Sequence, residues 1–506
     1  MDATQTLRDV ILRPRADAAP GWLEPARPGG RALTRQGAAA LVRAWCASAA
    51  VAPGRRLGLL ARDPVDLAAL FVGVIAAGGV AVPLDPRTPA AASADLLARA
   101  GAEAVVTTVA DAPDLGLPAV PLDADLRPTE GTGARPGGGP GGGVLLFSSG
   151  STGPRKAVLL REAQLLHVAR AVAGHHALTP DDRGYNPLPL FHVNAEVVAV
   201  LGSLVSGGTL VLDDRFHRRG FADLVRDRRI TWVNAVPAIL SILAADRPAR
   251  PLPASVRFVR SASAPLPVSV LERFEAGYGV QVLETYGMTE AASQITANPL
   301  DGGRRVGSVG VPVGVDLRVV GGRVQIRGDG VIRAYADGAG AERFGADGWL
   351  DTGDLGRLDA DGYLHLVGRD GDAINRGGEK VFPHAVEEVL RRHPGVRDAV
   401  VVGRADRVLG QVPVAHVVPE PPQDADRPER AGRLAAELRE LAARGLERSH
   451  VPVAVLVRAG LPAGPTGKVS RAAVAASEAG AETAAGAGAE AGADARTAVA
   501  GPAGSR

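Results

Sequence analysis

The stretch VLLFSSGSTGPRKAVLL at residues 144–160 carries a dense set of groups that could bind phosphate. An apolar run is followed by hydroxyl side chains and glycines, then by a lysine, and then by a second apolar run. Glycines let backbone N–H groups approach phosphate oxygens closely, and hydroxyls and a lysine add donors and charge. The residues concerned are Ser148, Ser149, Gly150, Ser151, Thr152, Gly153 and Lys156.

This loop is not a Walker loop. Walker chemistry requires a lysine followed by Ser or Thr that opens directly into a helix, whereas Lys156 is followed by Ala157 and by a predicted strand. A plain turn between two strands uses the same small and polar residues, so this stretch alone leaves both interpretations open.

Lysine is scarce in this chain, and its positions help to decide between a phosphate-binding loop and a plain turn. It occurs only at Lys156, Lys380 and Lys468, and every other basic side chain is an arginine. The compact charge of lysine suits a crowded phosphate or carboxylate site that the planar guanidinium of arginine cannot fill. The alternative is chance sampling of a rare residue, which weakens if all three lysines lie in motifs.

Bulk composition excludes several classes of protein. The 57 basic and 55 acidic residues nearly cancel, so no charged surface for nucleic acid is indicated. The single cysteine, Cys46, allows no disulfide framework and no cysteine-based metal site. The N-terminus lacks the apolar core of a signal peptide, and no apolar run approaches a membrane span. We therefore expect a cytoplasmic protein, monomeric or homodimeric, that binds neither nucleic acid nor membrane.

Hydrophobic periodicity predicts alternating helices and strands along most of the chain, which is typical of an α/β sheet. A glycine- and proline-rich tract at 127–143 interrupts the alternation, and we interpret it as an exposed linker. The predicted helices span 33–49, 63–78, 90–101, 162–173, 195–205 and 267–277, and the predicted strands span 55–61, 79–84, 103–108, 208–212, 255–260 and 280–283.

The pattern changes near residue 301, where short strands and glycine turns predict a β-rich subdomain. A final portion follows, with predicted helices at 384–392 and 427–447 and predicted strands at 398–403, 412–418 and 453–458. Residues 476–506 are nearly all alanine, glycine and small polar residues, so we expect them to be disordered.

The motifs SSGSTGPRK, YGMTE, TGD, GRDGD with GGEK, and PTGK occur in this chain in that order. Each could be a turn, but their coincidence is improbable. With them the chain resembles the adenylate-forming superfamily, which includes acyl-CoA synthetases, the adenylation domains of peptide synthetases and firefly luciferase. The resemblance covers about residues 20–472.

The resemblance implies an α/β fold. A large N-terminal domain at residues 1–370 would contain two α/β sheets and a β-rich subdomain, and would bind ATP and the acid. A small mobile α+β C-terminal domain at 371–475 would carry the adenylation lysine, and the tail at 476–506 would follow it. Gly371 stands at the position of the hinge between the domains, and glycine absorbs large changes in φ and ψ.

Members of this superfamily join a carboxylate to AMP, release pyrophosphate, and most often pass the acyl group to the thiol of coenzyme A. Because a carboxylate must attack the α-phosphorus of a polyanion, catalysis depends on positioning and on neutralising charge. The resemblance therefore implies ATP, Mg²⁺ and coenzyme A as cofactors, and a small carboxylic acid as the substrate.

The resemblance also implies roles for individual residues. The loop with Lys156 would hold the β- and γ-phosphates and favour the departure of pyrophosphate. Tyr286 would stack on adenine, Thr289 would donate to a phosphate, and Glu290 would hold Mg²⁺, a hard ion that favours carboxylate oxygen. Alone, Tyr286 fits an ordinary core aromatic residue and Glu290 fits a solvated acid at a helix start.

Further roles fall on more distant segments. Asp354 would bind the ribose hydroxyls with help from Arg369, and Lys468 would reach the carboxylate and the α-phosphate as the mobile domain swings. Lys380 lies in a loop that faces the coenzyme A tunnel in relatives. His192 matches a gate near the acyl carboxylate, although a satisfied core histidine explains it equally well.

The complete set of candidate residues follows from these motifs. Catalytic candidates are Lys468, Glu290, Thr289, His192 and Lys156, with Glu290 as the metal ligand. ATP-binding candidates are Ser148, Ser149, Gly150, Ser151, Thr152, Gly153, Lys156, Ser263, Ala264, Pro265, Glu284, Thr285, Tyr286, Gly287, Thr289, Asp354, Arg369 and Lys468. Acid-pocket candidates are His192, Val193, Asn194, Ser261, Gly287 and Met288, and candidates for binding coenzyme A are Gly377, Gly378 and Lys380.

Within the superfamily, the stretches RSASAPL at 260–266 and INRGGEKVFP at 374–383 are most similar to small-acid CoA ligases of the oxalate type. The chain departs from that pattern at Ser293, where a histidine tends to occur, and at Asn194-Ala195, where His-Gly is usual. These departures leave the acid open, and a larger or aromatic acid is equally compatible.

We interpret the chain as an ATP-dependent carboxylic acid–CoA ligase that acts through an acyl-adenylate. One alternative is an adenylating enzyme with another acceptor, such as a carrier-protein thiol, an amine, or nitrite in the diazotisation of an aryl amine. Another is a catalytically silent nucleotide-binding protein, against which the presence of Lys468, Glu290 and Asp354 argues.

Overall fold

The computed structural model describes residues 5–13, 16–19, 21–129, 142–148, 156–245, 251–462 and 469–478. Ser149, Gly150, Ser151, Thr152, Gly153 and Lys468 lie outside the described residues, as do most of the glycine- and proline-rich tract and of the C-terminal tail. The described residues form two compact units, which divide between residues 366 and 367. The predicted α/β fold class, with a large and a small part, is confirmed.

One sheet of the first unit contains the strands that flank the candidate phosphate loop. Its described strands lie in the order β6-β5-β3-β4-β7-β8. They span Ala119–Val120 (β6), Ala104–Thr107 (β5), Arg56–Leu60 (β3), Val80–Pro83 (β4), Gly143–Phe147 (β7) and Ala157–Arg161 (β8). All pairs are parallel except β7 and β8, which pair antiparallel with Phe147 opposite Ala157. The two apolar runs of the candidate loop therefore form a hairpin.

The second sheet of this unit is larger and mostly parallel. Its strands lie in the order β15-β14-β13-β12-β11-β9-β10-β1-β2. They span Val311–Pro312 (β15), Thr296–Ala297 (β14), Val282–Tyr286 (β13), Phe258–Ser261 (β12), Trp232–Ala235 (β11), Arg183–Asn186 (β9), Thr209–Leu212 (β10), Gly21–Pro25 (β1) and Leu33–Thr34 (β2). In β10, β11 and β12 every residue is buried, as expected for parallel strands covered on both faces.

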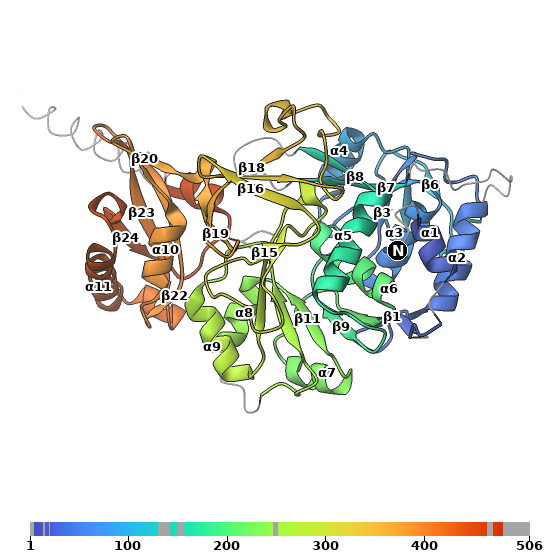
Figure 1. Ribbon diagram of the computed structural model, residues 1–506, viewed down its shortest axis with the longest axis horizontal. Helices are drawn as coiled ribbons and strands as arrows, with labels where there is room; N and C mark the ends of the chain where they lie inside the picture. Colours follow the sequence, from blue (N-terminus) through green and yellow to red (C-terminus); the bar gives the residue numbers. More distant parts are fainter. Residues whose placement is uncertain are drawn as a thin grey trace, which may run out of the picture. The chain divides into compact units, whose positions relative to one another are not determined.

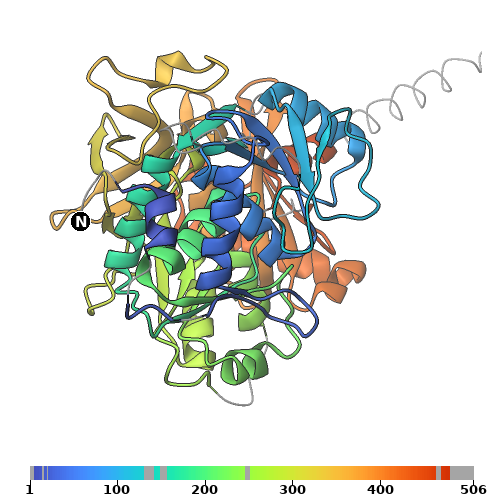
Figure 2. The same ribbon diagram turned by 90° about the vertical axis from the view of Figure 1, so that its right-hand side faces the viewer.

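Helices cover these sheets, and one apolar cluster joins both. The helices of the first unit are α1 (Leu7–Leu12), α2 (Arg35–Ala47), α3 (Pro64–Ala76), α4 (Ala90–Ala100), α5 (Glu162–His175), α6 (Gly202–Ser206), α7 (Phe221–Asp227), α8 (Pro237–Ala244) and α9 (Val268–Tyr278). Helices α8 and α9 pack against each other (Figure 1), and α1 and α2 lie side by side (Figure 2). The cluster includes Leu57 of β3, Leu70 of α3 and Val233 of β11, so the two sheets share one core.

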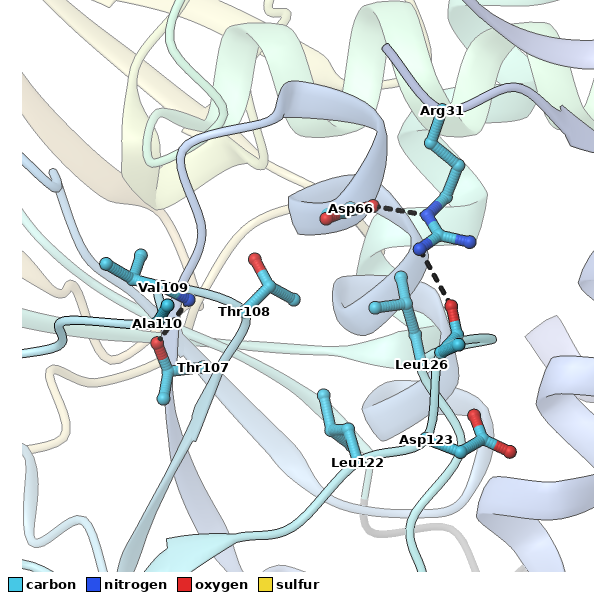
Figure 3. A pocket seen from close by; sticks show the side chains of 10 residues that line it. Arg31, Asp66, Thr107, Thr108, Val109, Ala110, Leu122, Asp123 and Leu126 are labelled. Carbon is cyan, nitrogen blue, oxygen red and sulfur yellow. Dashed lines mark hydrogen bonds and ion pairs between the residues drawn. The ribbon is translucent and has the colours of Figure 1, made fainter. Parts of the chain in front are cut away.

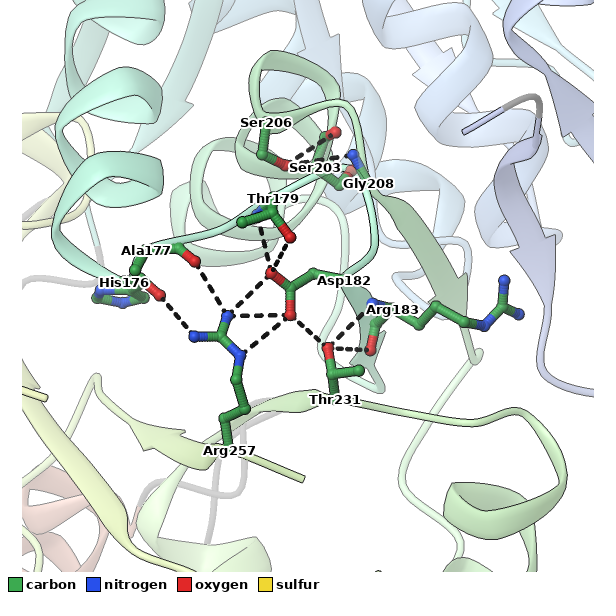
Figure 4. A network of polar contacts seen from close by, with 10 residues as sticks. All are labelled: His176, Ala177, Thr179, Asp182, Arg183, Ser203, Ser206, Gly208, Thr231 and Arg257. Atoms are coloured by element: carbon green, nitrogen blue, oxygen red, sulfur yellow. Dashed lines mark hydrogen bonds and ion pairs between the residues drawn. The ribbon is translucent and has the colours of Figure 1, made fainter. Parts of the chain in front are cut away.

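A polar network holds the starts of three parallel strands together (Figure 4). Asp182, just before β9, accepts hydrogen bonds from the Nη2 of Arg257 at 2.9 Å and from the hydroxyl of Thr231 at 2.7 Å. Thr231 precedes β11 and Arg257 precedes β12, so one buried carboxylate ties all three strands at their N-terminal ends. The opposite, C-terminal edge of these strands is where parallel sheets usually bind ligands.

The β-rich part predicted from residue 301 is present. Its sheet has the order β16-β17-β18-β19, with strands Asp316–Val320 (β16), Arg323–Arg327 (β17), Leu350–Leu358 (β18) and Leu364–Arg369 (β19). Short 3-10 turns occur at Thr289–Ala291 (η2), Ala341–Arg343 (η3) and Asp370–Asp372 (η4). Strand β18 carries Asp354, so this subdomain delivers a predicted ATP ligand.

The second unit is an α+β fold, as predicted. Its sheet has the order β21-β20-β23-β22, with β24 beside β23. The strands span Glu379–Val381 (β21), Ile374–Arg376 (β20), Gly410–Pro419 (β23), Val396–Asp406 (β22) and Ala454–Val457 (β24). The helices α10 (Pro383–Arg391) and α11 (Pro428–Gly445) pack on it around a separate apolar cluster that includes Val386, Val401 and Leu438, and short 3-10 turns lie at Pro422–Asp426 (η5) and Arg448–His450 (η6).

Most predicted elements agree with the structure, and the exceptions are informative. Periodicity missed α1, α8 and β1, which are short or lie next to proline. The predicted helix at 195–205 begins as a π-helix, η1 (Asn194–Leu201), and continues as α6. Single-turn π segments are frequent at functional sites, and η1 begins at a residue of the predicted acid pocket.

Candidate active site

The base of the candidate phosphate loop is closed by two predicted site residues. Ser148 donates its backbone N–H to the carbonyl of Lys156 at 2.9 Å, and the backbone N–H of Lys156 donates to the Ser148 Oγ at 3.2 Å. These bonds extend the β7–β8 hairpin by one step. Lys156 is therefore held at the point where the loop ends.

The side chain of Lys156 lies against a segment that sequence reasoning did not associate with the loop. Its Nζ is 4.8 Å from the centre of the Tyr335 ring, a cation–π arrangement. Asp337 accepts a hydrogen bond from the backbone N–H of Ala157 at 3.0 Å, and Gly340 approaches so closely that an added Cβ would lie 2.5 Å from Nζ. The 335–340 segment therefore positions this lysine.

Glu290, the predicted Mg²⁺ ligand, is buried and contacts the same tyrosine. Its Oε1 accepts a hydrogen bond from the Tyr335 hydroxyl at 2.7 Å and lies 3.4 Å from the Nη1 of Arg343, which also donates to that hydroxyl. Within the described residues, both contacts of the carboxylate go to Oε1. Tyr335 thus joins the lysine of one motif to the carboxylate of another.

The predicted adenine and ribose ligands also meet. The hydroxyl of Tyr286, at the end of β13, donates to the Oδ2 of Asp354 on β18 at 2.5 Å. Asp354 is 7% exposed, and its backbone N–H donates to the Thr352 hydroxyl at 3.1 Å. Two motifs far apart in the sequence are therefore adjacent, as a nucleoside site requires.

The turn after Tyr286 is unusually tight. A Cβ on Gly287 would lie 1.4 Å from the carbonyl oxygen of Ser293, so no other residue fits without rearrangement. Ala292 and Ser293 have φ of 48° and 102°, which side-chain-bearing residues rarely adopt. This turn holds Met288, Thr289 and Glu290 in fixed positions between β13 and β14.

The predicted acid pocket lies where η1, β12 and β13 approach one another. His192 is half-buried with its ring 4.8 Å from that of Phe191, and Val193 and Asn194 are buried. Asn194 donates through Nδ2 to the exposed Ser263 at 3.3 Å. Met288 and Gly287 are half-buried, so His192, Gly287 and Met288 present partly exposed surface.

The remaining predicted residues of this unit line the ends of β12 and β13. Ser261 is buried at the end of β12, and its carbonyl accepts from the Thr285 hydroxyl at 3.2 Å. Ser263 has a φ of 74°, which bends the chain away from the strand. Ala264, which is half-buried, and Pro265, which is exposed, follow in the same turn, and Glu284 is buried next to Thr285 on β13.

The second unit contains the predicted coenzyme A residues. Gly377 and Gly378 have φ of 59° and 93° and form the two-residue turn between β20 and β21, which requires positive φ at both positions. The Nζ of Lys380 lies 2.8 Å from the Oδ1 of Asp370. Arg369 ends β19 in this same unit.

Four residues near the site were missed by sequence reasoning: Tyr335, Asp337, Arg343 and Arg260. The first three contact motifs that lie 45 or more positions away in the chain, so no local pattern indicated them. Arg260 did carry a signal. It is a charged residue within the apolar strand SVRFVR, and the structure buries it to 1% exposure.

Burial changes the ionisation of two groups in this region. Burial, with no hydrogen-bond partner for the carboxyl among the described residues, raises the pKa of Glu196, on η1, well above its ordinary value. Burial also lowers the pKa of the Arg260 guanidinium to about 9. The guanidinium still carries its proton at neutral pH, so a positive charge is buried here, whereas the carboxyl of Glu196 favours its neutral form.

A cavity of about 330 Å³ lies elsewhere in the first unit, lined by Asp66 of α3, by residues 107–110 at the end of β5 and by the 122–126 segment (Figure 3). Arg31 and Asp66 form an ion pair of 2.6 Å on its wall. None of the predicted site residues lines this cavity.

The helices in the described part of the chain include none that is both long enough and apolar enough to cross a membrane.

Comparison with known proteins places this geometry in a family. Residues 34–335 match the AMP-binding enzyme family, and residues 385–468 match the AMP-binding enzyme C-terminal domain. The sulfoacetate–CoA ligase of Cupriavidus necator is 42% identical over 342 residues, which cover 65% of this chain and 65% of that protein. This chain thus matches just under two thirds of the length of that relative.

Two further comparisons agree with the match to AMP-binding enzymes. The oxalate–CoA ligase of Arabidopsis thaliana is 35% identical over 355 residues, which cover 66% of this chain and 67% of that protein. A crystal structure of the o-succinylbenzoate CoA synthetase of Bacillus subtilis, in complex with its acyl-adenylate intermediate, superimposes with a TM-score of 0.77 at 25% identity, covering 92% of this chain and 97% of that one. The chain belongs to the family of AMP-binding enzymes, in the adenylate-forming superfamily.

Proposed function

We propose that this protein is an ATP-dependent acid–CoA ligase, which converts a small carboxylic acid to its acyl-adenylate and then to a thioester. The observation that carries the proposal is the convergence on Tyr335. This residue contacts both the lysine that ends the phosphate loop and the carboxylate of Glu290. One cation for phosphate and one hard ligand for a divalent cation are thereby held together, and the Tyr286–Asp354 pair belongs to the same unit.

The residues present fit Mg²⁺ and ATP. Glu290 offers a carboxylate oxygen, the ligand that Mg²⁺ prefers, and its contacts with described residues engage only the other oxygen of that carboxylate. Bound there, Mg²⁺ would neutralise phosphate charge. Lys156 would bind the β- and γ-phosphates, and Tyr286 and Asp354 would hold the adenine and ribose.

The proposed reaction has two steps, adenylation and thioester formation. A carboxylate oxygen of the acid forms a bond to the α-phosphorus, and the bond between the α-phosphorus and the bridging oxygen breaks, so pyrophosphate leaves with its charge neutralised. The sulfur of coenzyme A then bonds to the acyl carbon, the bond between that carbon and the phosphate oxygen of AMP breaks, the thiol proton passes to solvent, and AMP leaves. The adenylation step depends on electrostatic stabilisation, for which Lys156 and, from the second unit, Lys468 are the proposed cations.

The relatives support both a small acid and coenzyme A as the acceptor. The names of the two curated relatives described above identify them as CoA ligases for sulfoacetate and for oxalate. The Bacillus structure contains an acyl-adenylate, the intermediate proposed here. The roles assigned to Gly377, Gly378 and Lys380 in binding coenzyme A are part of this proposal.

A two-part assay tests the proposal. Exchange of labelled pyrophosphate into ATP is measured with a panel of carboxylic acids, and thioester formation is then measured with and without coenzyme A. We expect exchange with at least one small acid and a thioester of that acid. Exchange with no acid would contradict the enzymatic function, and exchange without a thioester would point to a different acceptor.

A further inference from the structure

The Arg260 side chain is surrounded by neutral amides instead of acids. Its Nη1 donates to the Oδ1 of Asn194 at 2.7 Å and to the Oδ1 of Asn234 at 3.1 Å, and its Nη2 lies 3.4 Å from the Oε1 of Gln294. Asn234 pairs with Arg260 in register on the adjacent strand β11, and Asn194 begins η1. Among the described residues, no carboxylate lies within ion-pair distance of this guanidinium.

The arginine determines how each amide around it is oriented. Because a guanidinium only donates hydrogen bonds, it must face the oxygen of every amide it contacts, and the NH₂ groups point outward. Asn234 accordingly donates to Asn186 at 2.9 Å, and Asn194 donates to Ser263 at 3.3 Å. Ser263 is exposed, so two hydrogen bonds lead from the surface to the buried charge.

The cluster has more donors than acceptors. The Nε of Arg260 and the Nε2 of Gln294 are buried and have no hydrogen-bond partner among the described residues. A buried donor without an acceptor costs about 1–3 kcal/mol, and more if it is charged. A buried guanidinium is usually paired with a carboxylate, because its desolvation must be offset.

Among the described residues of the unit, the other buried arginine, Arg35, does not share this arrangement. The Nε and Nη2 of Arg35 donate to the carbonyls of Ala19 at 2.8 Å and Gly208 at 2.6 Å. The unusual feature of Arg260 is therefore a buried donor without an acceptor, together with its place on β12 in contact with η1, where the predicted pocket residues Asn194 and Ser261 lie.

We propose that the acid substrate carries a second anionic group, besides the carboxylate that is adenylated, and that Arg260 and Gln294 bind this group. An anionic oxygen would replace the Oδ1 of Asn194 as the acceptor for Nη1, and would also accept from the unpartnered Nε and from the Gln294 amide. Charge-assisted bonds of this kind are stronger than the neutral bond they replace. Asn234 keeps the guanidinium in position, so it is a positioning residue. This inference rests on the proposed function.

Pairs of acids that share a skeleton and differ in the second charge test the inference with the unmodified enzyme. Suitable pairs are sulfoacetate with 3,3-dimethylbutanoate, malonate with acetoacetate, and phthalate with 2-acetylbenzoate. AMP formation is measured as kcat/KM for each acid. For the best pair, we expect the dianion to be preferred over its singly charged analogue by at least about 10-fold.

A variant then assigns the preference to the arginine. Arg260→Gln should lower kcat/KM for the dianion by at least about 10-fold more than for the singly charged acid, and should raise the KM for the dianion. Arg260→Lys should retain part of the preference because it keeps the charge. Arg35→Gln is the matched control, since it removes another buried guanidinium without touching the pocket, and it should leave the ratio between the paired acids unchanged.

The outcomes separate the two proposals. Equal use of both members of every accepted pair by the unmodified enzyme would overturn the inference and leave the acid–CoA ligase proposal standing. A preference that survives in a folded Arg260→Gln variant would also overturn it. If no acid supports AMP formation, the proposed function fails first, and the inference fails with it.

Discussion

Single side chains of this protein differ in how well their surroundings match their charge, and Glu196 is the clearest case. It lies on η1, is 1% exposed, and neither oxygen of its carboxyl has a hydrogen-bond partner among the described residues. Burial raises its pKa well above 4.5. The folded protein therefore binds this proton more tightly than the unfolded chain does.

Glu196→Gln should stabilise the protein at neutral and alkaline pH but not near pH 4.5. Because the folded pKa is raised, the stability that the proton supplies is full below the unfolded value and is lost as pH rises toward the folded value. Glutamine has no proton to lose, so the difference in Tm between variant and parent should increase from pH 5 to pH 8.

The difference between the two proteins must be measured at each pH, because other groups titrate as well. Burial lowers the pKa of His176 well below 6.5. The folded protein therefore loses stability as pH falls, and this loss is the same in the variant and in the parent. A difference in Tm that is the same at pH 5 and pH 8 would contradict a neutral Glu196.

Tyr335 is the second side chain with a testable role. Tyr335→Phe keeps the ring that lies under Lys156 and removes the hydroxyl that donates to Glu290. A hydrogen bond to a charged group is worth about 1.5–3 kcal/mol, so AMP formation at limiting Mg²⁺ should fall by about 10-fold or more. Saturating Mg²⁺ should restore part of the rate, and an unchanged Mg²⁺ dependence would show that this bond does not position the carboxylate.

At the scale of elements, the 335–340 segment and the β7–β8 hairpin act together. The two are joined by the hydrogen bond from Ala157 to Asp337 and by the contact of Lys156 with Tyr335. Gly340 has a φ of 67° and approaches Lys156 closely, whereas Gly338 has a φ of 72° and has nothing within 4 Å of an added Cβ. The two glycines thus share a positive φ, which would strain any other residue, and differ in contact.

Gly340→Ala should impair AMP formation more than Gly338→Ala does. Both substitutions carry the cost of a side chain at positive φ, about 1–2 kcal/mol. Only the methyl group at 340 displaces the Nζ of Lys156, because it would lie 2.5 Å away. The test measures the KM for ATP and the Tm of both variants. We expect both variants to lose a similar amount of Tm, and we expect the KM to increase only in Gly340→Ala. Equal KM values would mean that Lys156 does not need its present position.

At the scale of the whole molecule, the proposed reaction requires residues from both units. Lys156, Glu290, Tyr286 and Asp354 belong to the first unit, whereas Arg369 and Lys380 belong to the second. Lys468 lies outside the described residues, so its role rests on its place in the PTGK motif. The mobility of the second domain is likewise a prediction.

Lys468→Ala should separate the two half-reactions. Adenylation should fall by at least about 100-fold, since a cation that neutralises developing charge is lost. Thioester formation from a supplied acyl-adenylate should remain close to that of the parent, because no phosphate is displaced by the acid in that step. Single-turnover measurements of each half-reaction provide the test, and an equal loss of both would show that this lysine acts elsewhere.

The sequence by itself determined the family and most of the helices and strands, and it indicated the reaction class that we propose. Its phosphate-handling motifs are short and continuous, and turns such as Gly377-Gly378 follow from local residue types. Amphipathic periods survive in a single chain because each element buries one face, so α2, α5 and α10 were predicted close to their observed bounds.

Only the tertiary structure decided which groups meet. Tyr335 reaches Glu290 from 45 positions away, and Arg260 reaches Asn194 from 66 positions away. No local pattern encodes such contacts, because they depend on strand order and on how η1 packs over the sheet. The sequence indicated the chemistry that we propose for a carboxylate, whereas the buried donors of Arg260, which bear on the proposed choice of acid, became visible only when its neighbours proved to be amides.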